Sequence, residues 1–319
     1  MIFKPITTDI YCAHAEPYIG VFASQKWLSI YKDRLSFIGI YKAENQLIGG
    51  YFFLKTKKYG VSFLKLPPYT PHCGLFFIND SQNTSAINSQ VKEIITEVCN
   101  HISAQKSTIT VLAFPHTVID LQPFIWQKFK VIPNYTYQLN LQKTIDELKN
   151  NFDSKNRNAI NKAIKDEVII LENTLSKQEL FNFFISSLNT TNANIYTEEL
   201  DNIFNVFSDA TNSFCQVATK NNELLGVVFC VFDKNVCYYL LGGINKQKGL
   251  QGVNNLLILK SIEKAKQLGC TTFDFEGSML VGVEKFFRSF GGQLIPYYTV
   301  NKANILLELL LKFKKRELF

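Results

Sequence analysis

Two acidic side chains have the placement of a proton-transfer site. Residues 271–276 read as a strand, and side chains alternate along a strand, so Asp274 and Glu276 face one side while two phenylalanines face the other. A glycine ends the strand, and Ser278 is expected to cap a helix over residues 279–290. Ligand sites in open α/β sheets lie where strands end and helices begin. We therefore expect Asp274 or Glu276 to accept a proton, and burial would raise its pKa.

The predicted helix after this strand carries three further charges, Glu284, Lys285 and Arg288. Their position beside the two carboxylates makes them candidates for binding substrate. The alternative is purely structural: Lys285 and Arg288 would neutralise the carboxylates in a salt-linked turn.

A loop at residues 246–255, KQKGLQGVNN, follows a strand and opens a helix. Glycines let backbone N–H groups approach a phosphate, and a helix N-terminus favours anions. The alternative is an ordinary connection. The equivalent stretch of the first half, residues 78–85, has no glycine, so we expect no phosphate-binding loop there. The candidate phosphate-binding residues of the 246–255 loop are Gly249, Gln251, Gly252, Asn254 and Asn255.

A basic helix is predicted at residues 154–165, with Ser154 as its cap. Lys155 and Lys162 are seven residues apart and therefore lie on nearly one face, where they could hold phosphates. A solvated helix face is the alternative.

Two tyrosines complete the candidate site. Tyr238 lies on a strand that leads toward the 246–255 loop and could protonate a leaving group, although strand tyrosines also serve as core. Tyr69 lies in a loop at residues 67–74 with three prolines and a glycine, which predicts an ordered loop. We expect this loop to line a substrate groove.

The elements that position these residues occur twice. A hairpin at residues 37–53 aligns without a gap on one at residues 214–230, with five identities in seventeen positions. Each hairpin is followed by strand, loop, helix, strand, helix and strand. We predict two copies of one α/β module with mixed sheets, at residues 1–143 and 144–319.

Composition sets the broad class. The 319 residues are 46% hydrophobic and 13% aromatic, which suffices for two cores. The net charge of +7 permits an anionic partner without requiring one. Seven cysteines without CxxC and four scattered histidines predict reduced thiols and no metal site. The N-terminus has no signal-peptide pattern and no apolar run reaches about 20 residues, so we expect a soluble cytoplasmic protein.

These motifs resemble a known family. The order of elements in each module resembles the GNAT acyltransferase fold, and two tandem copies resemble the FemABX group of peptidyltransferases. The basic segment KNRNAINKA at residues 155–163 and the segments FDFEGS and VEKFFRSFG at residues 273–278 and 283–291 are similar to segments of that group. The resemblance covers most of the chain.

The resemblance implies transfer of an acyl or aminoacyl group to an amine. The donor would be acyl-CoA or aminoacyl-tRNA, with no tightly bound cofactor, and the acceptor a nucleotide- or lipid-linked cell-wall peptide precursor. The 246–255 loop would hold the donor, and the first half, which lacks such a loop, is expected to bind no donor and to serve the acceptor. By similarity to the family, Arg157 is the basic residue favoured for contact with a phosphate. Gln251 stands where the GNAT loop has glycine or alanine, which is a departure from CoA binding. The alternatives are a CoA-dependent N-acetyltransferase of a small amine or peptide, and a catalytically silent binding protein of the same fold.

The chain ends in a predicted helix at residues 303–317 that is apolar and then basic. Such a helix could make peripheral contact with a membrane surface. Docking against the second module is the favoured alternative.

Overall fold

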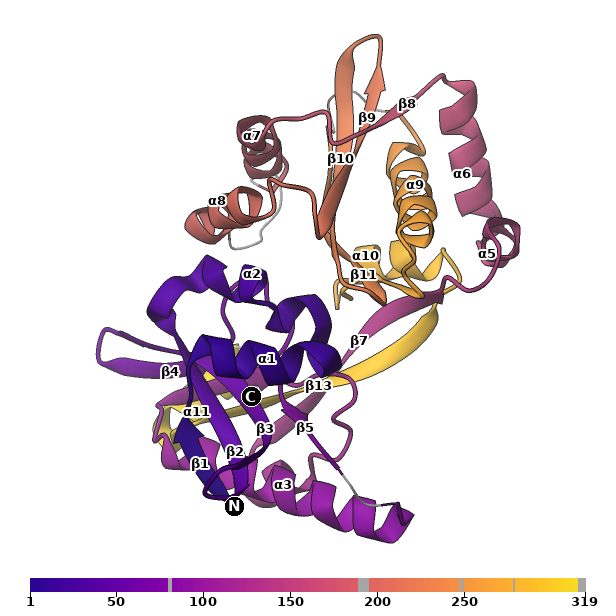
Figure 1. The fold of residues 1–319 in the computed structure, drawn as a ribbon. Coiled ribbons are helices and arrows are strands. Elements are labelled where there is room, and N and C mark those ends of the chain that lie inside the picture. Colours follow the sequence, from indigo (N-terminus) through magenta and orange to yellow (C-terminus); the bar gives the residue numbers. More distant parts are fainter. Residues whose placement is uncertain (80–81, 189–194, 246, 248–249, 278, 315–319) are drawn as a thin grey trace. The chain divides into compact units, whose positions relative to one another are not determined.

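The computed structural model describes residues 1–79, 82–188, 195–245, 247, 250–277 and 279–314. The chain forms two compact units, one of Met1–Asn134 with Pro296–Phe319 and one of Tyr135–Ile295. Each is described here by itself (Figure 1).

Unit 1 is built on a sheet with the strand order β1-β2-β3-β4-β6-β13. The strands β4 and β6 are parallel and the other neighbours are antiparallel. The short β5 (Phe76–Phe77) pairs with β3. The strands are β1 (Ile2–Pro5), β2 (Leu35–Ala43), β3 (Gln46–Lys58), β4 (Val61–Lys65), β6 (Ile109–Ala113) and β13 (Gln293–Ala303). The helices are α1 (Thr8–Ile19), α2 (Gln25–Leu28), α3 (Thr84–Ala104), α4 (Gln122–Trp126) and α11 (Ile305–Lys314), with 3₁₀ turns at Gly20–Ala23 and Ser29–Arg34.

Unit 2 has the strand order β7-β12-β11-β10-β9-β8, with β11 and β12 parallel and the other pairs that join described strands antiparallel. The helix α9 packs on β9, β10 and β11 from one face, and α7 reaches β11 (Figure 1). The strands are β7 (Lys130–Asn140), β8 (Ile169–Glu172), β9 (Ser213–Lys220), β10 (Glu223–Phe232), β11 (Val236–Ile244) and β12 (Thr272–Asp274). The helices are α5 (Ile145–Asn151), α6 (Ser154–Lys165), α7 (Lys177–Leu188), α8 (Thr197–Val206), α9 (Val253–Gln267) and α10 (Val281–Arg288).

Both predicted hairpins are present, β2–β3 in unit 1 and β9–β10 in unit 2. The units differ from the predicted modules at their ends. Residues 138–140 of β7 pair with β12, and residues 299–303 of β13 pair with β6. The predicted division 1–143 and 144–319 placed β7 in the first module and β13 in the second. In the structure, β7 belongs to unit 2 from Tyr135 onward, and β13 belongs to unit 1 from Pro296 onward.

Alternation along β7 and β12 separates a core face from a polar face. Leu139 and Phe273 are buried in the core of unit 2, together with Phe275 just after β12. The intervening residues are polar and occupy the opposite face, as the sequence predicted for Asp274. Strand alternation therefore places the candidate site on the face away from this core.

Three helices, α6, α10 and α11, differ from the predictions in their caps, bounds or packing. The cap of α6 is Asp153, whose side chain accepts from the N–H of Asn156, and not Ser154. The helix predicted at residues 279–290 spans Val281–Arg288, and Ser278 lies outside the described residues. The C-terminal helix groups with unit 1, whereas docking against the second module was expected.

Candidate functional site

The parallel strands of unit 2 separate at their carboxyl ends. β11 and β12 are paired from Val236–Tyr238 and Thr272–Asp274, and β11 then runs on to Ile244. The register between β10 and β11 shifts between Tyr239 and Leu241, which is typical of a β-bulge that bends a strand. Tyr238 and Asp274 form the last pair, so both lie where the strands part. In open α/β sheets this is where ligands bind.

Asp274 is buried, with 5% of its surface exposed, and it accepts hydrogen bonds from Thr136, Gln138 and Glu276. Thr136 Oγ1 donates to Oδ1 at 2.5 Å, Gln138 Nε2 donates to Oδ2 at 2.7 Å, and the N–H of Glu276 donates to Oδ1 at 2.8 Å. A carboxylate that already accepts several donors is stabilised in its charged form and poorly placed to take a further proton. Asp274 is therefore suited to fixing the neighbouring turn.

Glu276 has the properties of a proton acceptor. Its backbone is in the left-handed region, with φ of +59°, a strained conformation that is often found at functional sites. Gly277 follows with φ of +74°, and a Cβ there would lie 2.3 Å from the carbonyl oxygen of Tyr135. Burial raises the pKa of Glu276 well above its ordinary value of 4.5, and the charge of Asp274 raises it further. A carboxylate with a raised pKa is a stronger base.

Tyr238 lies close enough to these carboxylates for their charge to change its pKa. Burial raises the pKa of Tyr238, and the negative charges of Asp233, Glu276 and Asp274 raise it further. The phenol therefore keeps its proton at neutral pH and can donate it. The structure thus brings together Tyr238, Asp274 and Glu276, the three residues that the sequence assigned to catalysis.

The charged residues of α10 pair within unit 2 in a different way from the salt-linked turn considered above. Arg288 Nε donates to Glu284 Oε1 at 2.9 Å, and Tyr137 OH donates to the same oxygen at 2.7 Å. Burial and this hydrogen bond raise the pKa of Tyr137 to about 12. Lys285 is exposed. Arg288 thus pairs with Glu284.

The end of the predicted donor loop packs against α6. Gly252 is buried with φ of +88°, and a Cβ there would lie 2.0 Å from the carbonyl oxygen of Ala159. Gln251 is exposed, and Gly249 lies outside the described residues. The close approach of α6 explains the glycine at position 252 without a ligand.

Two asparagines at the start of α9, Asn254 and Asn255, differ in their side-chain hydrogen bonds. Asn255 Nδ2 donates to Asn156 Oδ1 at 3.0 Å, and Asn156 Nδ2 donates to Ser289 Oγ at 2.9 Å, which ties α9 to α6 and the end of α10. Asn254 Oδ1 is buried and lacks a hydrogen-bond partner within the described part of the chain. An unsatisfied buried polar atom is costly, so Asn254 is the residue of this loop best placed to meet a ligand.

The basic residues of α6 have partners of their own. Arg157 Nη1 donates to the carbonyl of Phe152 and, at 3.4 Å, to that of Asn150, so it caps the last turn of α5. Lys162 pairs with Asp166 at 3.1 Å, and Lys155 is exposed. No contact between described residues joins these three cations to Glu276, so the structure does not gather them around the carboxylates.

In unit 1, Tyr69 lies in a loop that is firmly held. Trp27 Nε1 donates to Thr70 Oγ1 at 3.0 Å, and Tyr11 OH donates to the carbonyl of Gly74 at 2.6 Å. Tyr69 itself has φ of +61° and is partly buried. The prediction of an ordered loop is confirmed.

The same loop fills the position in unit 1 that corresponds to the open strand ends of unit 2. Beyond the end of β4, the N–H of Cys73 donates to the carbonyl of Ala113, and the N–H of Phe52 donates to the carbonyl of Cys73, both at 2.9 Å. The chain itself thus bridges β3 and the end of β6. This is a second reason to expect that unit 1 binds no donor.

Sequence reasoning missed Thr136 and Gln138, the partners of Asp274. Their signal is the alternation in β7, where Thr136, Gln138 and Asn140 interrupt apolar residues. A polar face on a strand that also contributes to a core indicates a site or a solvated surface.

The substitution Asp274→Asn should lower the pKa of Glu276. It removes a negative charge while leaving burial unchanged, so the pKa falls yet stays above 4.5. The expected result is a shift of the Glu276 carboxyl titration to lower pH, read by carbon-13 NMR. An unchanged titration would show that the two carboxyls do not interact.

Comparisons with known proteins agree with this architecture. A family model described as acetyltransferase (GNAT) domain matches residues 196–288. FemX superposes with a TM-score of 0.66 at 15% identity, over 98% of this chain and 99% of that one. L-PGS from Bacillus licheniformis gives 0.56 at 12% identity, over 96% of each chain. A tandem GNAT protein from the clavulanic acid biosynthesis pathway gives 0.55 at 8% identity, over 94% and 98%.

A search of curated protein sequences finds no match. Among the described residues, none of the helices is both long and apolar enough to cross a membrane. The matched domain includes Tyr238, Asp274 and Glu276, and the structural likeness extends over nearly the whole length of FemX. The chain therefore has the tandem GNAT fold that it shares with FemX, with a GNAT domain at residues 196–288 of unit 2.

Proposed function

We propose that this protein transfers an acyl or aminoacyl group to an amine at the open ends of β11 and β12. The observation that carries the proposal is Glu276, a carboxyl with a raised pKa beside Tyr238 and fixed by Asp274. Support comes from the fold shared with FemX and L-PGS and from the GNAT domain in unit 2.

The residues of unit 2 can supply both proton transfers of aminolysis. The amine attacks the carbonyl carbon of the ester or thioester, and Glu276 takes the proton that the nitrogen loses. As the carbon–oxygen or carbon–sulfur bond breaks, Tyr238 gives its proton to the leaving group. The proton on Glu276 then restores the phenol, so the site ends as it began. Asp274 holds the backbone of Glu276 throughout.

The donor is an activated acyl ester or thioester, and an aminoacyl-tRNA is favoured over acyl-CoA. At Gly252 the chain packs closely against α6, because an added Cβ would meet the carbonyl oxygen of Ala159, and this contact accounts for the glycine without a bound phosphate. Gln251 also departs from the GNAT loop. A CoA-dependent N-acetyltransferase is the second candidate, supported by the domain match.

The acceptor is an amine, and a nucleotide- or lipid-linked peptide precursor of the cell wall is the proposed class. The site is proposed to work in the cytoplasm. All seven cysteines are buried and free, which suits a reducing compartment.

The experiment is a transfer assay with three radiolabelled donors, acetyl-CoA, alanyl-tRNA and seryl-tRNA, and a cell-wall pentapeptide precursor that contains lysine. Label in the peptide from either tRNA supports the favoured donor. Label from acetyl-CoA alone makes the protein an N-acetyltransferase. No label from any donor, by protein that is folded by circular dichroism, would support a catalytically silent binding protein and contradict the proposal.

A membrane contact is proposed for α11. Leu309, Leu310 and Phe313 are 54%, 64% and 90% exposed, and the sequence around them carries several lysines. An apolar helix face flanked by basic residues binds the surface of anionic bilayers. Changing all three residues to serine should abolish co-sedimentation with phosphatidylglycerol vesicles.

A matched control for α11 is Ile119→Ser, which removes an equally exposed apolar side chain of unit 1 at another place. This variant should sediment like the unmodified protein. Equal binding by all three proteins would refute the role of α11.

A further inference from the structure

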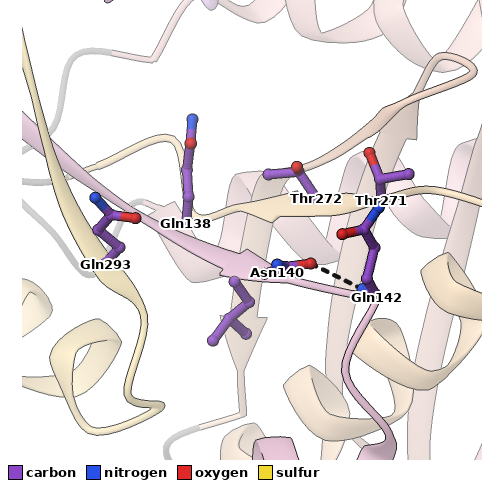
Figure 2. A pocket seen from close by; sticks show the side chains of 7 residues that line it. Gln138, Asn140, Gln142, Thr271, Thr272 and Gln293 are labelled. Atoms are coloured by element: carbon purple, nitrogen blue, oxygen red, sulfur yellow. Dashed lines mark hydrogen bonds between the residues drawn. The ribbon is translucent and has the colours of Figure 1, made fainter.

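A polar hollow of about 260 Å³ lies beside β7 and β12 in unit 2. Six of its seven lining residues are polar and none is charged (Figure 2). They are Gln138, Leu139, Asn140, Gln142, Thr271, Thr272 and Gln293. A wall of amides and hydroxyls without a charge suits an uncharged ligand that both donates and accepts hydrogen bonds.

The orientation of two of these amides is fixed by their partners. Gln138 Nε2 donates to the carboxylate of Asp274, which only accepts, so Gln138 Oε1 remains as an acceptor. Asn140 Oδ1 accepts from the backbone N–H of Gln142 at 2.9 Å, so Asn140 Nδ2 remains as a donor. Amide assignments are usually ambiguous, but here the partners decide them.

The fixed acceptor and the fixed donor lie on the same face of β7. Gln138 and Asn140 are two residues apart, about 7 Å along a strand. Thr272 is opposite Asn140 in the antiparallel pairing and adds a hydroxyl. The hollow therefore presents one acceptor and one donor of fixed orientation next to a hydroxyl, while Asn140, Gln142, Thr271 and Gln293 are exposed to solvent.

The hollow is connected to the candidate site. Gln138 lines it and donates to Asp274, which in turn accepts from the N–H of Glu276. A ligand that accepts from Asn140 and donates to Gln138 would thus bind next to the group that positions the proton acceptor.

We infer that this hollow is a binding site for an uncharged group with neighbouring donor and acceptor atoms, the amide of a peptide or the hydroxyls of a sugar. That the bound group belongs to the acceptor substrate rests on the proposed function. That the hollow binds such a group does not. Recognition depends on Gln138 Oε1 and Asn140 Nδ2.

The first test is a titration of the full chain, labelled with nitrogen-15, with N-acetylalanine N-methylamide in one arm and methyl glucoside in the other. The expected result is a saturable shift of the side-chain amide signals of Asn140 and Gln138. A shift with only one probe identifies the peptide or the sugar as the source. No shift with either probe at millimolar concentrations overturns the inference, whether or not transfer is observed.

The second test is Asn140→Asp, which still accepts from the N–H of Gln142 but replaces the donor Nδ2 with an acceptor. Binding of the effective probe should weaken about tenfold or more, since a hydrogen bond is lost and two acceptors face each other. Asn182→Asp on α7 makes the same change of charge at an exposed position and should bind normally. Equal affinity of Asn140→Asp and Asn182→Asp would overturn the role of Asn140.

Discussion

Replacing Glu276 by glutamine is expected to reduce the rate of group transfer by about a hundredfold to ten-thousandfold, the range for loss of a general base. The amide keeps the size of the side chain and cannot take a proton from the amine. Asp274 still accepts from the backbone N–H at position 276, so the turn is retained. The measurement is kcat in the transfer assay with the effective donor, because a lost proton acceptor lowers kcat more than it changes KM.

A matched control for Glu276 is Glu167→Gln. Glu167 also has a left-handed backbone, with φ of +57°, but it is exposed at the end of α6. This variant should transfer at the normal rate. If Glu276→Gln and Glu167→Gln are equally active, Glu276 is not the proton acceptor.

The substitution Glu276→Gln should leave the protein at least as stable as the unmodified protein at neutral pH. The pKa of Glu276 is raised on folding, so the folded state binds this proton more tightly than the unfolded chain. The stability that the proton contributes is complete below the unfolded value of 4.5 and is lost as the pH rises through the folded pKa. Glutamine removes this loss. In urea titrations, the free energy of unfolding of the variant minus that of the unmodified protein should increase as the pH rises above 4.5.

Local pattern predicts which of the candidate residues share a face of the strand but not which groups they bond to. Alternation in 271–276 predicts that Asp274 and Glu276 share a face, because the period of a strand is two. The hydrogen bonds of Asp274 come from β7, about 140 residues earlier, and depend on which strands pair. Strand pairing over such a distance is set by the tertiary fold, which a local pattern does not encode.

The charged residues show a different failure of local reasoning. Arg157 was expected to contact a phosphate by similarity to the family, but its guanidinium donates to the carbonyls of Asn150 and Phe152 at the end of α5. Arg288 likewise pairs within α10. A long side chain can reach several partners. Residue type and spacing therefore predict the helix face on which an arginine lies but not the group to which it donates a hydrogen bond.

Gly252 gives the second large effect, on stability. In Gly252→Ala the new Cβ would meet the carbonyl oxygen of Ala159 at 2.0 Å, and the backbone would be held at φ of +88°. The expected loss is about 2–5 kcal/mol, from about 1–2 kcal/mol of backbone strain and about 1–3 kcal/mol of overpacking. The measurement is the free energy of unfolding in urea without any ligand.

A matched control lies at the other end of α9. Gly269 has φ of +87°, and a Cβ there would meet nothing within 4 Å. Gly269→Ala should therefore lose only the backbone strain, about 1–2 kcal/mol. The difference between the two variants measures the contact between α6 and the start of α9. If both lose the same amount, α6 can yield to the methyl group, and a glycine at position 252 would then be better explained by a bound donor than by packing.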